Sequence, residues 1–295
     1  MSLNLEKMNH KYNSFIQTLK SERIAFLTRH EKEKLLAPIF HQNFGCAVIH
    51  VDSIDTDTLG TFTREIPRHG TQREAARKKA EIAAKLANCR FGIGSEGSFI
   101  ADPWTGMMPW NLEILLLLDT LSGHEIAGIA QGPGMRMQHE VKDMEALHKF
   151  AAQAGFPYHH LIIRPDDGDQ PVMAKGINNI DHLRIAFDEA ISKSNRQQVF
   201  VENDLRAHCN PTRQAMIINA AKNLVERLQS QCPLCQHPDF WVSRREDGLP
   251  CRDCGKSTRV SKAEIWLCAN CNYLESRELR SESYAEPMNC DYCNP

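Results

Sequence analysis

Eight of the eleven cysteines fall in four Cys-x-x-Cys pairs near the C-terminus, a spacing suited to holding a metal ion. Fifteen residues separate the first pair from the second, and eighteen separate the third from the fourth. Two such pairs supply four thiolates, which close a tetrahedron around Zn²⁺ and leave no open position for catalysis. The sequence therefore predicts two structural zinc sites, with the ligands Cys232, Cys235, Cys251, Cys254, Cys268, Cys271, Cys290 and Cys293.

Our expectation for the four pairs is sequential pairing, the first with the second and the third with the fourth, which gives tandem zinc ribbons over residues 231–295. Cross-braced pairing, the first with the third, stays open because the sequence does not fix the partners. Iron–sulfur ligation is a lesser alternative, since every ligand is a cysteine. So many paired thiols indicate metal binding in a reducing cytoplasm rather than disulfides.

The stretch from Gly60 to Phe99 holds the second set of residues that could do chemistry. Thr71 and Glu74 have the spacing of a capping box, which predicts a helix that starts at Gln72. The apolar residues before Ser95 predict a short strand over 91–94, and Glu96 then lies where that strand ends. A polar loop, a helix N-terminus and a strand-end carboxylate suit a phosphate-plus-metal site. The alternative is an ordinary strand–helix–strand unit with solvated charges.

A second wall for this site is predicted after a buried strand over 198–201. A helix over 211–228 follows, with Asn210 as its N-cap and a proline at its first position. His208 and Arg213, near the start of that helix, are candidates for binding phosphate or a base. The alternative is that Asp204 and Arg206 pair only to hold a loop in place.

Strands that alternate with helices predict an α/β fold, a mixed twisted sheet flanked by helices. We expect a helical N-terminal extension over 1–21, an α/β domain over 22–230 with an insertion at about 136–197, and the zinc-ribbon domain over 231–295. The further elements we expect are strands over 23–28, 46–51, 114–118 and 160–163, and helices over 31–40, 140–154 and 181–193. The loop over 103–110 carries two Trp and two Met, and we expect it to fold onto its own core rather than to form a lid or a contact surface.

The main domain resembles the house-cleaning nucleoside triphosphate pyrophosphatases, the inosine/xanthosine triphosphatase superfamily. The resemblance lies in a first strand that ends in Thr28 and is followed by Lys32 and Lys34, in the helix residues Glu74-Ala75-Ala76 and Lys79-Ala80, and in Gly94-Ser95-Glu96-Gly97-Ser98. It continues in a hairpin that contains Asp119 and Gly123, and in Asn210-Pro211-Thr212-Arg213. The resemblance implies an inosine triphosphatase-like sheet and metal-dependent hydrolysis of nucleoside triphosphates or related phosphorylated small molecules.

The resemblance also implies roles for individual residues. Acidic residues would hold Mg²⁺ or Mn²⁺ and orient water, namely Glu96 with Glu65 or Glu74, and Asp119. Other side chains would bind substrate and neutralise phosphate, namely Thr28, Lys32 or Lys34, Arg68, Lys79, His208 and Arg213.

The chain departs from that superfamily at three points. His30 stands where the superfamily has Asn, no clear match exists for the metal-binding Glu before the helix, and about sixty residues are inserted. These departures favour the alternative of a non-catalytic nucleotide binder or scaffold. The whole chain also resembles an uncharacterised bacterial family of unknown function, through the phrases GTFTREIP, SEGSF, PWNLEI, NPTR and CDYCNP.

Composition limits the classes of partner. The formal net charge is −2, and residues 231–295 hold eight Lys or Arg against ten Asp or Glu, a balance that disfavours nucleic acid. No apolar run is long enough for a membrane span, and the first residues lack the apolar core of a signal peptide, so we expect a cytoplasmic protein. We expect a phosphorylated small-molecule ligand and a protein partner for the ribbons. The oligomeric state is open, with a homodimer among the alternatives.

Overall fold

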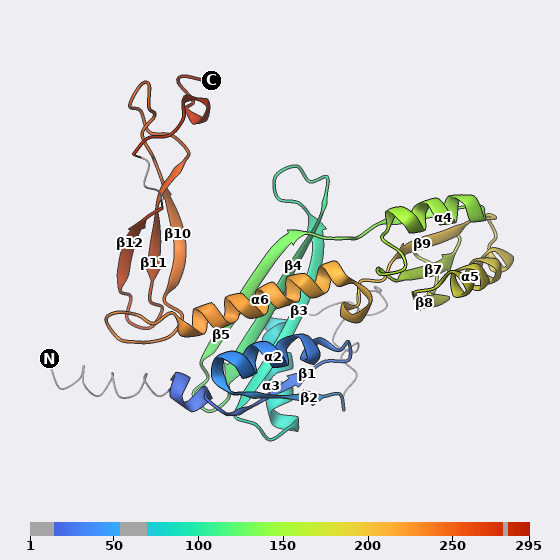
Figure 1. The fold of residues 1–295 in the computed structure, drawn as a ribbon, viewed down its shortest axis with the longest axis horizontal. Helices are drawn as coiled ribbons and strands as arrows, with labels where there is room; N and C mark the ends of the chain where they lie inside the picture. Colours follow the sequence, from blue (N-terminus) through green and yellow to red (C-terminus); the bar gives the residue numbers. More distant parts are fainter. Residues whose placement is uncertain (1–14, 54–69, 280–282) are drawn as a thin grey trace. The chain divides into compact units, whose positions relative to one another are not determined.

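The computed structural model describes residues 15–53, 70–279 and 283–295. Two compact units divide the chain: the main unit is Ser21–Val225, and the second combines Met1–Lys20 with Glu226–Pro295 (Figure 1). The predicted residues Glu65 and Arg68 lie outside the described residues, as does most of the N-terminal extension.

A five-stranded mixed sheet, in the order β2-β1-β3-β4-β5, forms the centre of the main unit. β1 (Arg23–Leu27) runs parallel to β2 (Ala47–Val51) and to β3 (Phe91–Ala101). β4 (Pro109–Asp119) and β5 (Glu125–Pro133) continue the sheet in the antiparallel direction. The predicted mixed α/β sheet is therefore confirmed.

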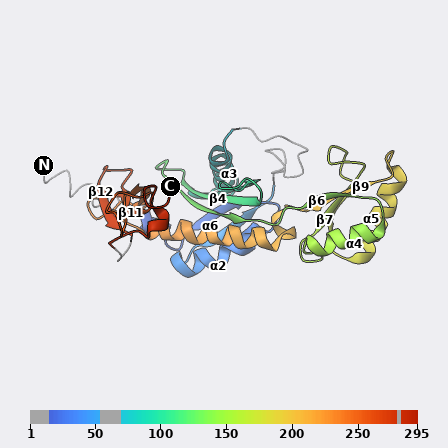
Figure 2. The same ribbon diagram turned by 90° about the horizontal axis from the view of Figure 1, so that it is seen from above.

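Helices cover both faces of this sheet. Figure 2 shows α3 (Gln72–Leu86) on one face, and α2 (Lys32–Phe44) and α6 (Pro211–Gln229) on the other. α3 starts at Gln72 as predicted, because Thr71 and Glu74 form both hydrogen bonds of a capping box. The start of α6 at Pro211 is also confirmed.

The close packing of α3 on β3 depends on two glycines. A Cβ atom at Gly92 would lie 2.0 Å from the carbonyl oxygen of Ala80, and one at Gly94 would lie 1.7 Å from that of Ala76. Both contacts are with helix backbone, which cannot turn aside as a flexible side chain can. The small residues of α3 and the glycines of β3 therefore fix the distance at which the helix lies, and with it the position of Lys79.

We expect Gly94→Ala to destabilise the main unit by about 1–3 kcal/mol or more, because the added methyl group would push α3 off the sheet. Urea unfolding of the variant and the wild type measures the loss. Gly132→Ala is the matched control in the same sheet, since its Cβ would meet only the terminal methyl of Met216, at 3.0 Å. Equal stability of the two variants would contradict this account of the packing.

The insertion forms a smaller sheet of its own, in the order β6-β9-β7-β8, with all neighbours antiparallel. Its elements in chain order are β6 (Gln138–Val141), α4 (Met144–Gln153), β7 (Leu161–Pro165), β8 (Ala174–Ile177), α5 (Ile180–Lys193) and β9 (Val199–Asn203). Side chains of both helices, such as Phe150 and Phe187, share one apolar core with Ile163 and Val201 of the strands. α5 and the inner strands β7 and β9 agree with the expected ranges, but α4 begins at Met144 because residues 140–141 belong to β6, and neither β6 nor β8 was predicted.

The second unit contains a three-stranded antiparallel sheet of β10 (Trp241–Asp247), β11 (Ser261–Leu267) and β12 (Leu274–Glu278). Its apolar core is small, with Phe240 packed among four of the cysteines, Trp266 and Tyr273. Such a small core gives the unit little apolar stabilisation of its own.

The long β3–β4 hairpin corrects two predictions. The strands were expected over 91–94 and 114–118, but β3 continues to Ala101 and β4 begins at Pro109. The loop between them does not fold onto a core, because Trp104 and Met107 are 76% and 82% exposed. The carboxylate of Asp102 shapes this loop instead, accepting hydrogen bonds from four backbone N–H groups and from the Thr105 hydroxyl.

Candidate functional site

The first pair of candidate side chains lies between α3 and β3. Lys79 Nζ lies 2.5 Å from Glu96 Oε1, and the two side chains are only 11% and 5% exposed. Glu96 follows Gly92 and Gly94 at alternate positions of the strand, so its side chain points to the face that α3 covers. Gln72, in the first turn of α3, donates hydrogen bonds to the backbone carbonyls of Glu96 and Leu112, which fixes this end of the helix against the hairpin.

A second buried ion pair lies on the opposite face of the sheet. Arg213 Nε of α6 donates to Glu113 Oε1 of β4 at 2.7 Å, and both side chains are fully buried. Asn111 Nδ2 donates to the same carboxylate oxygen at 3.1 Å, while Glu113 Oε2 is buried without a hydrogen-bond partner among the residues that the structure describes. Gly97, opposite Glu113 in the register, leaves the room for this carboxylate, because a Cβ there would lie 2.3 Å from Oε1.

Lys32, in the first turn of α2, is the third buried cation. Its ammonium group donates to Ser95 Oγ at 3.0 Å, and within the described residues it makes no ion pair. Burial and the positive charge of Arg213 lower the pKa of Lys32 to about 7, while Glu113 and Glu96 act in the opposite direction. Lys32 is thus within electrostatic reach of both ion pairs, and we call these five residues the charge cluster: Lys32, Lys79, Glu96, Glu113 and Arg213.

The charge cluster lies where β1 stops pairing with β3. The last paired residues are Phe26 of β1 and Ile93 of β3, and Ser95 and Glu96 follow directly on β3. The parallel strand β1 ends here and its chain enters α2, so a helix N-terminus is brought to the same place. Glu96, Lys79 and Arg213 therefore do not meet in one cleft: Lys79 and Glu96 form an ion pair on one face of the sheet, whereas Arg213 pairs with Glu113 on the opposite face, and Lys32 lies within electrostatic reach of both pairs.

Two histidines lie beside the charge cluster. The rings of His30 and His208 are 5.3 Å apart between centroids and tilted by 32°. Burial, followed by the nearby charge of Lys32, lowers the pKa of His30 to about 3, and burial also lowers the pKa of His208. The His30 imidazole is therefore neutral at neutral pH, and within the described part of the chain Nδ1 of His208 is buried without a hydrogen-bond partner.

Several residues predicted for the site lie elsewhere. Asp119 pairs with Phe91 in the register, at the far end of β3 from Glu96, and both its oxygens accept hydrogen bonds from Arg90. The Glu74 carboxylate is exposed and belongs to the helix cap, where the backbone N–H of Thr71 lowers its pKa. Lys34 is exposed and pairs with Glu31.

Thr28 is buried at the end of β1, and its hydroxyl accepts a hydrogen bond from the backbone of His30, so it shapes the turn into α2. Sequence reasoning gave no role to Glu113, Asn111 or Ser95, all of which are buried in this region. A signal for Glu113 existed: Asn111 and Glu113 alternate with apolar residues at the start of β4, which puts both polar groups on one buried face.

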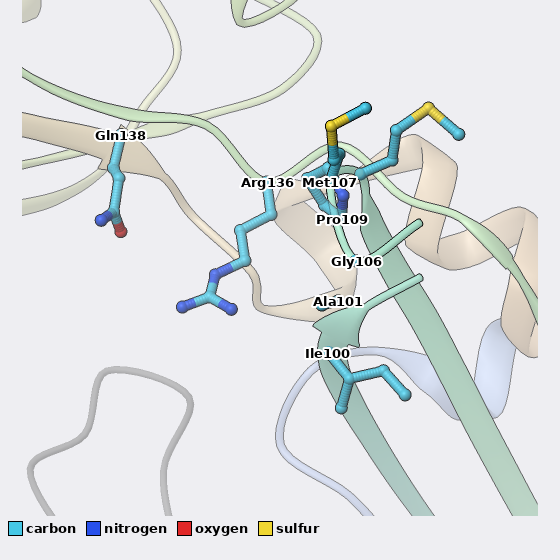
Figure 3. Close-up of a pocket in the computed structure, with 8 residues that line it drawn as sticks. Ile100, Ala101, Gly106, Met107, Pro109, Arg136 and Gln138 are labelled. Atoms are coloured by element: carbon cyan, nitrogen blue, oxygen red, sulfur yellow. The ribbon is translucent and has the colours of Figure 1, made fainter. Parts of the chain in front are cut away.

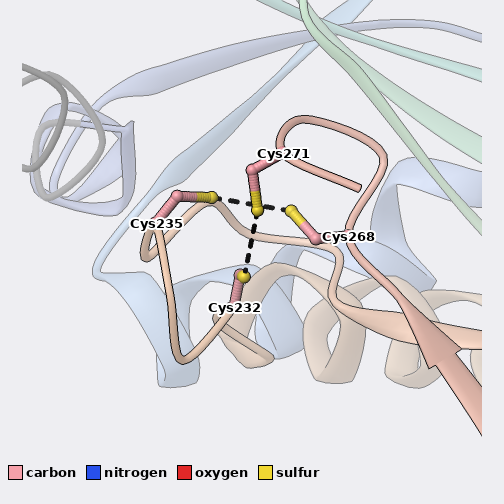
Figure 4. Close-up of side chains that lie close together, drawn as sticks. All are labelled: Cys232, Cys235, Cys268 and Cys271. Atoms are coloured by element: carbon pink, nitrogen blue, oxygen red, sulfur yellow. Dashed lines mark hydrogen bonds between the residues drawn. The ribbon is translucent and has the colours of Figure 1, made fainter. Parts of the chain in front are cut away.

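The eight predicted metal ligands form two groups of four. Cys232, Cys235, Cys268 and Cys271 make the first group (Figure 4). The second group is made of Cys251, Cys254, Cys290 and Cys293. Sulfur–sulfur distances are 3.6 and 3.7 Å in the first group and 3.6 and 3.8 Å in the second. A tetrahedral ion with Zn–S bonds of about 2.3 Å requires a sulfur–sulfur distance of about 3.8 Å, so both groups fit a metal ion.

The grouping shows that the expectation of sequential pairing is wrong. The first Cys-x-x-Cys pair joins the third and the second joins the fourth, so the two groups interleave along the chain. The antiparallel β10 and β11 explain this, because the pair before β10 and the pair after β11 are brought together at one end of the sheet. The groups differ in exposure: Cys254 and Cys293 are exposed, whereas the first group is almost entirely buried.

A depression of about 330 Å³ lies at the tip of the β3–β4 hairpin (Figure 3). Met107, Met108 and Ile100 line it together with Arg136 and Gln138 from the segment that follows β5. None of the charge-cluster residues lines this depression, so it is separate from the candidate site.

A profile of the family described as "Domain of unknown function (DUF6671)" matches residues 79–295. The chain belongs to this family. Comparison with curated proteins and with solved structures finds no match. The DUF6671 region begins at Lys79 and contains Glu96, Glu113, Arg213 and all eight cysteines of the two groups, whereas Lys32 precedes it. Among the described residues, no helix is sufficiently long and apolar to span a membrane.

Proposed function

We propose that the main unit binds a phosphorylated small molecule, with nucleoside triphosphates as the first class to test, at the charge cluster. The observation that carries this proposal is the buried ammonium group of Lys32, which has no carboxylate partner within the described residues. With Lys32 protonated, the cluster has three cations and two carboxylates. A buried cation without a counter-ion is costly, and an anionic ligand would remove that cost.

The N-terminus of α2 supports the same ligand class. Its N-cap residue Glu31 has left-handed backbone angles, and in the described structure its side chain forms no cap hydrogen bond. Backbone N–H groups and the helix dipole attract anions at such an end. Together with the resemblance to nucleoside triphosphate pyrophosphatases in Thr28, Lys32 and the Gly94–Ser98 segment, this favours phosphate over other anions.

Thermal-shift measurements with pyrophosphate, triphosphate and a nucleotide panel test the proposal. A ligand at 100 times its dissociation constant stabilises a protein by about 2.7 kcal/mol, and we expect a shift of that order in the wild type. Lys32→Met should lose most of the shift, whereas Glu74→Gln, which changes an exposed carboxylate outside the cluster, should keep it. A shift of equal size in the wild type and Lys32→Met would refute the proposal.

Hydrolysis of the bound molecule is the second candidate function, favoured by Oε2 of Glu113, which is buried and accepts no hydrogen bond from the described residues. The described carboxylates do not fit a Mg²⁺ or Mn²⁺ site, because Glu96 and Glu113 each lie against a cation and no acidic group of metal-binding geometry occurs among them. Glu65 lies outside the described residues. Release of phosphate or pyrophosphate from a nucleotide panel, with and without metal and with Glu96→Gln as the variant, separates a hydrolase from a binder.

For the second unit, the proposal assigns Zn²⁺ to both four-cysteine groups as a structural ion. Four thiolates fill the coordination of each ion, which fits a structural role and leaves no position for a substrate. The unit would then serve as a contact surface for a protein partner, in agreement with its acidic balance of charged residues.

A further inference from the structure

Ser95 and Lys32 form a buried hydrogen-bonded pair that binding alone does not require. The 3.0 Å bond joins Lys32 Nζ of α2 to Ser95 Oγ of β3, and the two residues are 7% and 4% exposed. A hydroxyl becomes a useful nucleophile when a base within hydrogen-bond distance can take its proton, and a serine–lysine pair is one known arrangement. The amine must be neutral for this task, and Lys32 has no carboxylate beside it to keep it charged among the described residues.

We infer that Ser95 is a nucleophile activated by Lys32, and that it accepts the phosphoryl group of the phosphorylated small molecule bound at the charge cluster. This inference rests on the proposed function for its substrate class. It goes beyond that function by naming a covalent serine intermediate, which hydrolysis by metal-activated water would not form.

The step balances without any further co-reactant. Ser95 Oγ attacks phosphorus, its proton passes to Lys32 Nζ, and the bond from phosphorus to the leaving oxygen breaks. The leaving oxygen takes up a proton, which Lys32 can return. Water then attacks the phosphoserine, releases inorganic phosphate and restores the Ser95 hydroxyl, so that the sum is hydrolysis of one phosphate ester or anhydride bond.

The charges around Lys32 come from every element packed near it. Arg213 of α6 and Lys79 of α3 disfavour its charged form, while Glu113 of β4 and Glu96 of β3 favour it. His30, neutral beside it, adds no charge. Burial has the largest effect and lowers the pKa of Lys32 to about 7, so in the protein without a bound anion a substantial fraction of the amine is neutral just above that pH. Arg213, which lies on the same face of the sheet as Ser95, is the cation placed to hold the phosphoryl oxygens.

Diisopropyl fluorophosphate, an uncharged phosphorylating reagent that releases fluoride, tests the inference on the full-length protein. We expect one added diisopropylphosphoryl group per chain, located by peptide mass spectrometry on Ser95. The labelling rate should rise about tenfold per pH unit below pH 7 and level off above it, because only neutral Lys32 can accept the proton. Anion binding should weaken as the pH rises over the same range, because it needs the charged amine, so labelling and anion binding should change with pH in opposite directions.

Three variants complete the test. Lys32→Arg keeps the positive charge but cannot serve as a base, so labelling should fall by about 100-fold or more while the thermal shift with pyrophosphate persists. Ser95→Ala should abolish labelling. Ser98→Ala changes a half-buried serine on the same strand that is hydrogen-bonded to Gln72, and it should label like the wild type.

Wild-type protein that does not label at any pH between about 6 and 9, or labels elsewhere than Ser95, would overturn the inference, and this result needs no variant to fold. Labelling of Ser95 that is undiminished in Lys32→Arg would overturn the role of Lys32. If the protein does not label but keeps its thermal shift with pyrophosphate, the covalent step is rejected and the binding proposal stands. If the protein labels on Ser95 but shows no thermal shift with pyrophosphate, the binding proposal is rejected.

Discussion

Replacing Cys232, Cys235, Cys268 and Cys271 together by serine should leave one zinc ion per chain, and replacing Cys232, Cys235, Cys251 and Cys254 should leave none. The first set removes one complete four-cysteine group and spares the other, whereas the second set takes two ligands from each group. Sequential pairing gives the opposite numbers, none for the first set and one for the second. The two variants have the same number of substitutions, so each is the control for the other.

The effect is large because structural zinc contributes about 10–16 kcal/mol per site in zinc-finger peptides at neutral pH, and two thiolates do not replace four. The measurement is metal content by mass spectrometry of protein purified under reducing conditions, after removal of loosely bound ions. Wild-type protein should hold two zinc ions per chain. One ion in the second variant and none in the first would show that the interleaved grouping is wrong.

The identity of the metal ligands could be predicted from the sequence, but their partners could not. Cysteine side chains at Cys-x-x-Cys spacing carry their chemistry locally, in the thiolate and in the turn between them. Their grouping depends on which strands pair, and linkers of fifteen and eighteen residues are long enough for either arrangement. The pairing of β10 with β11 decides it, and that pairing leaves no local mark on the cysteines.

Helices were easier to predict than the strands beside them. The start of α3 at Gln72 follows from the capping box, and that of α6 from Asn210 and Pro211, since these signals act within a few residues. β3 was cut short at Gly94 because Ser95, Glu96 and Gly97 look like the end of a strand. They continue the strand because they pair with residues 113–115 of β4, while Lys32 and Lys79 from other elements contact the Ser95 hydroxyl and the Glu96 carboxylate.

Contacts between elements that are distant in the sequence also decide which candidate site residues lie together. Lys79 and Glu96 were predicted as members of one site, and they form a direct ion pair because α3 lies close over β3. Asp119 is also an acid, but it pairs with Phe91 at the start of β3, whereas Glu96 lies in the middle of that strand, a distinction that depends on register. Glu113 was missed because its partner Arg213 is 100 residues further along the chain.

The free energy of unfolding of the main unit should rise between pH 7 and about pH 10, and Lys32→Met should remove that rise. The folded-state pKa of Lys32 is lowered from 10.5 to about 7, so between these values the unfolded chain binds one more proton than the folded one. Stability therefore increases with pH in this window, by up to about 1.4 kcal/mol per pH unit and on the order of 4 kcal/mol in total. Below pH 7 Lys32 is protonated in the folded and in the unfolded protein, so its contribution to the free energy of unfolding no longer changes with pH and stays at its least favourable value.

Urea unfolding followed by tryptophan fluorescence, at several pH values with zinc in excess, measures the difference between wild type and Lys32→Met. Lys32→Met should be more stable than the wild type at pH 6 and should lose that advantage by pH 10. Subtracting the free energy of unfolding of one protein from that of the other at each pH cancels the contributions of the other groups that titrate in this range. Parallel curves for the two proteins would contradict the buried, unpaired state of Lys32.

Saturating pyrophosphate adds a further constraint, because a bound anion favours the charged amine and raises its pKa. The rise in stability should then begin at a higher pH in the wild type and stay unchanged in Lys32→Met, which connects the pH dependence of folding to the same ammonium group that the ligand is proposed to contact.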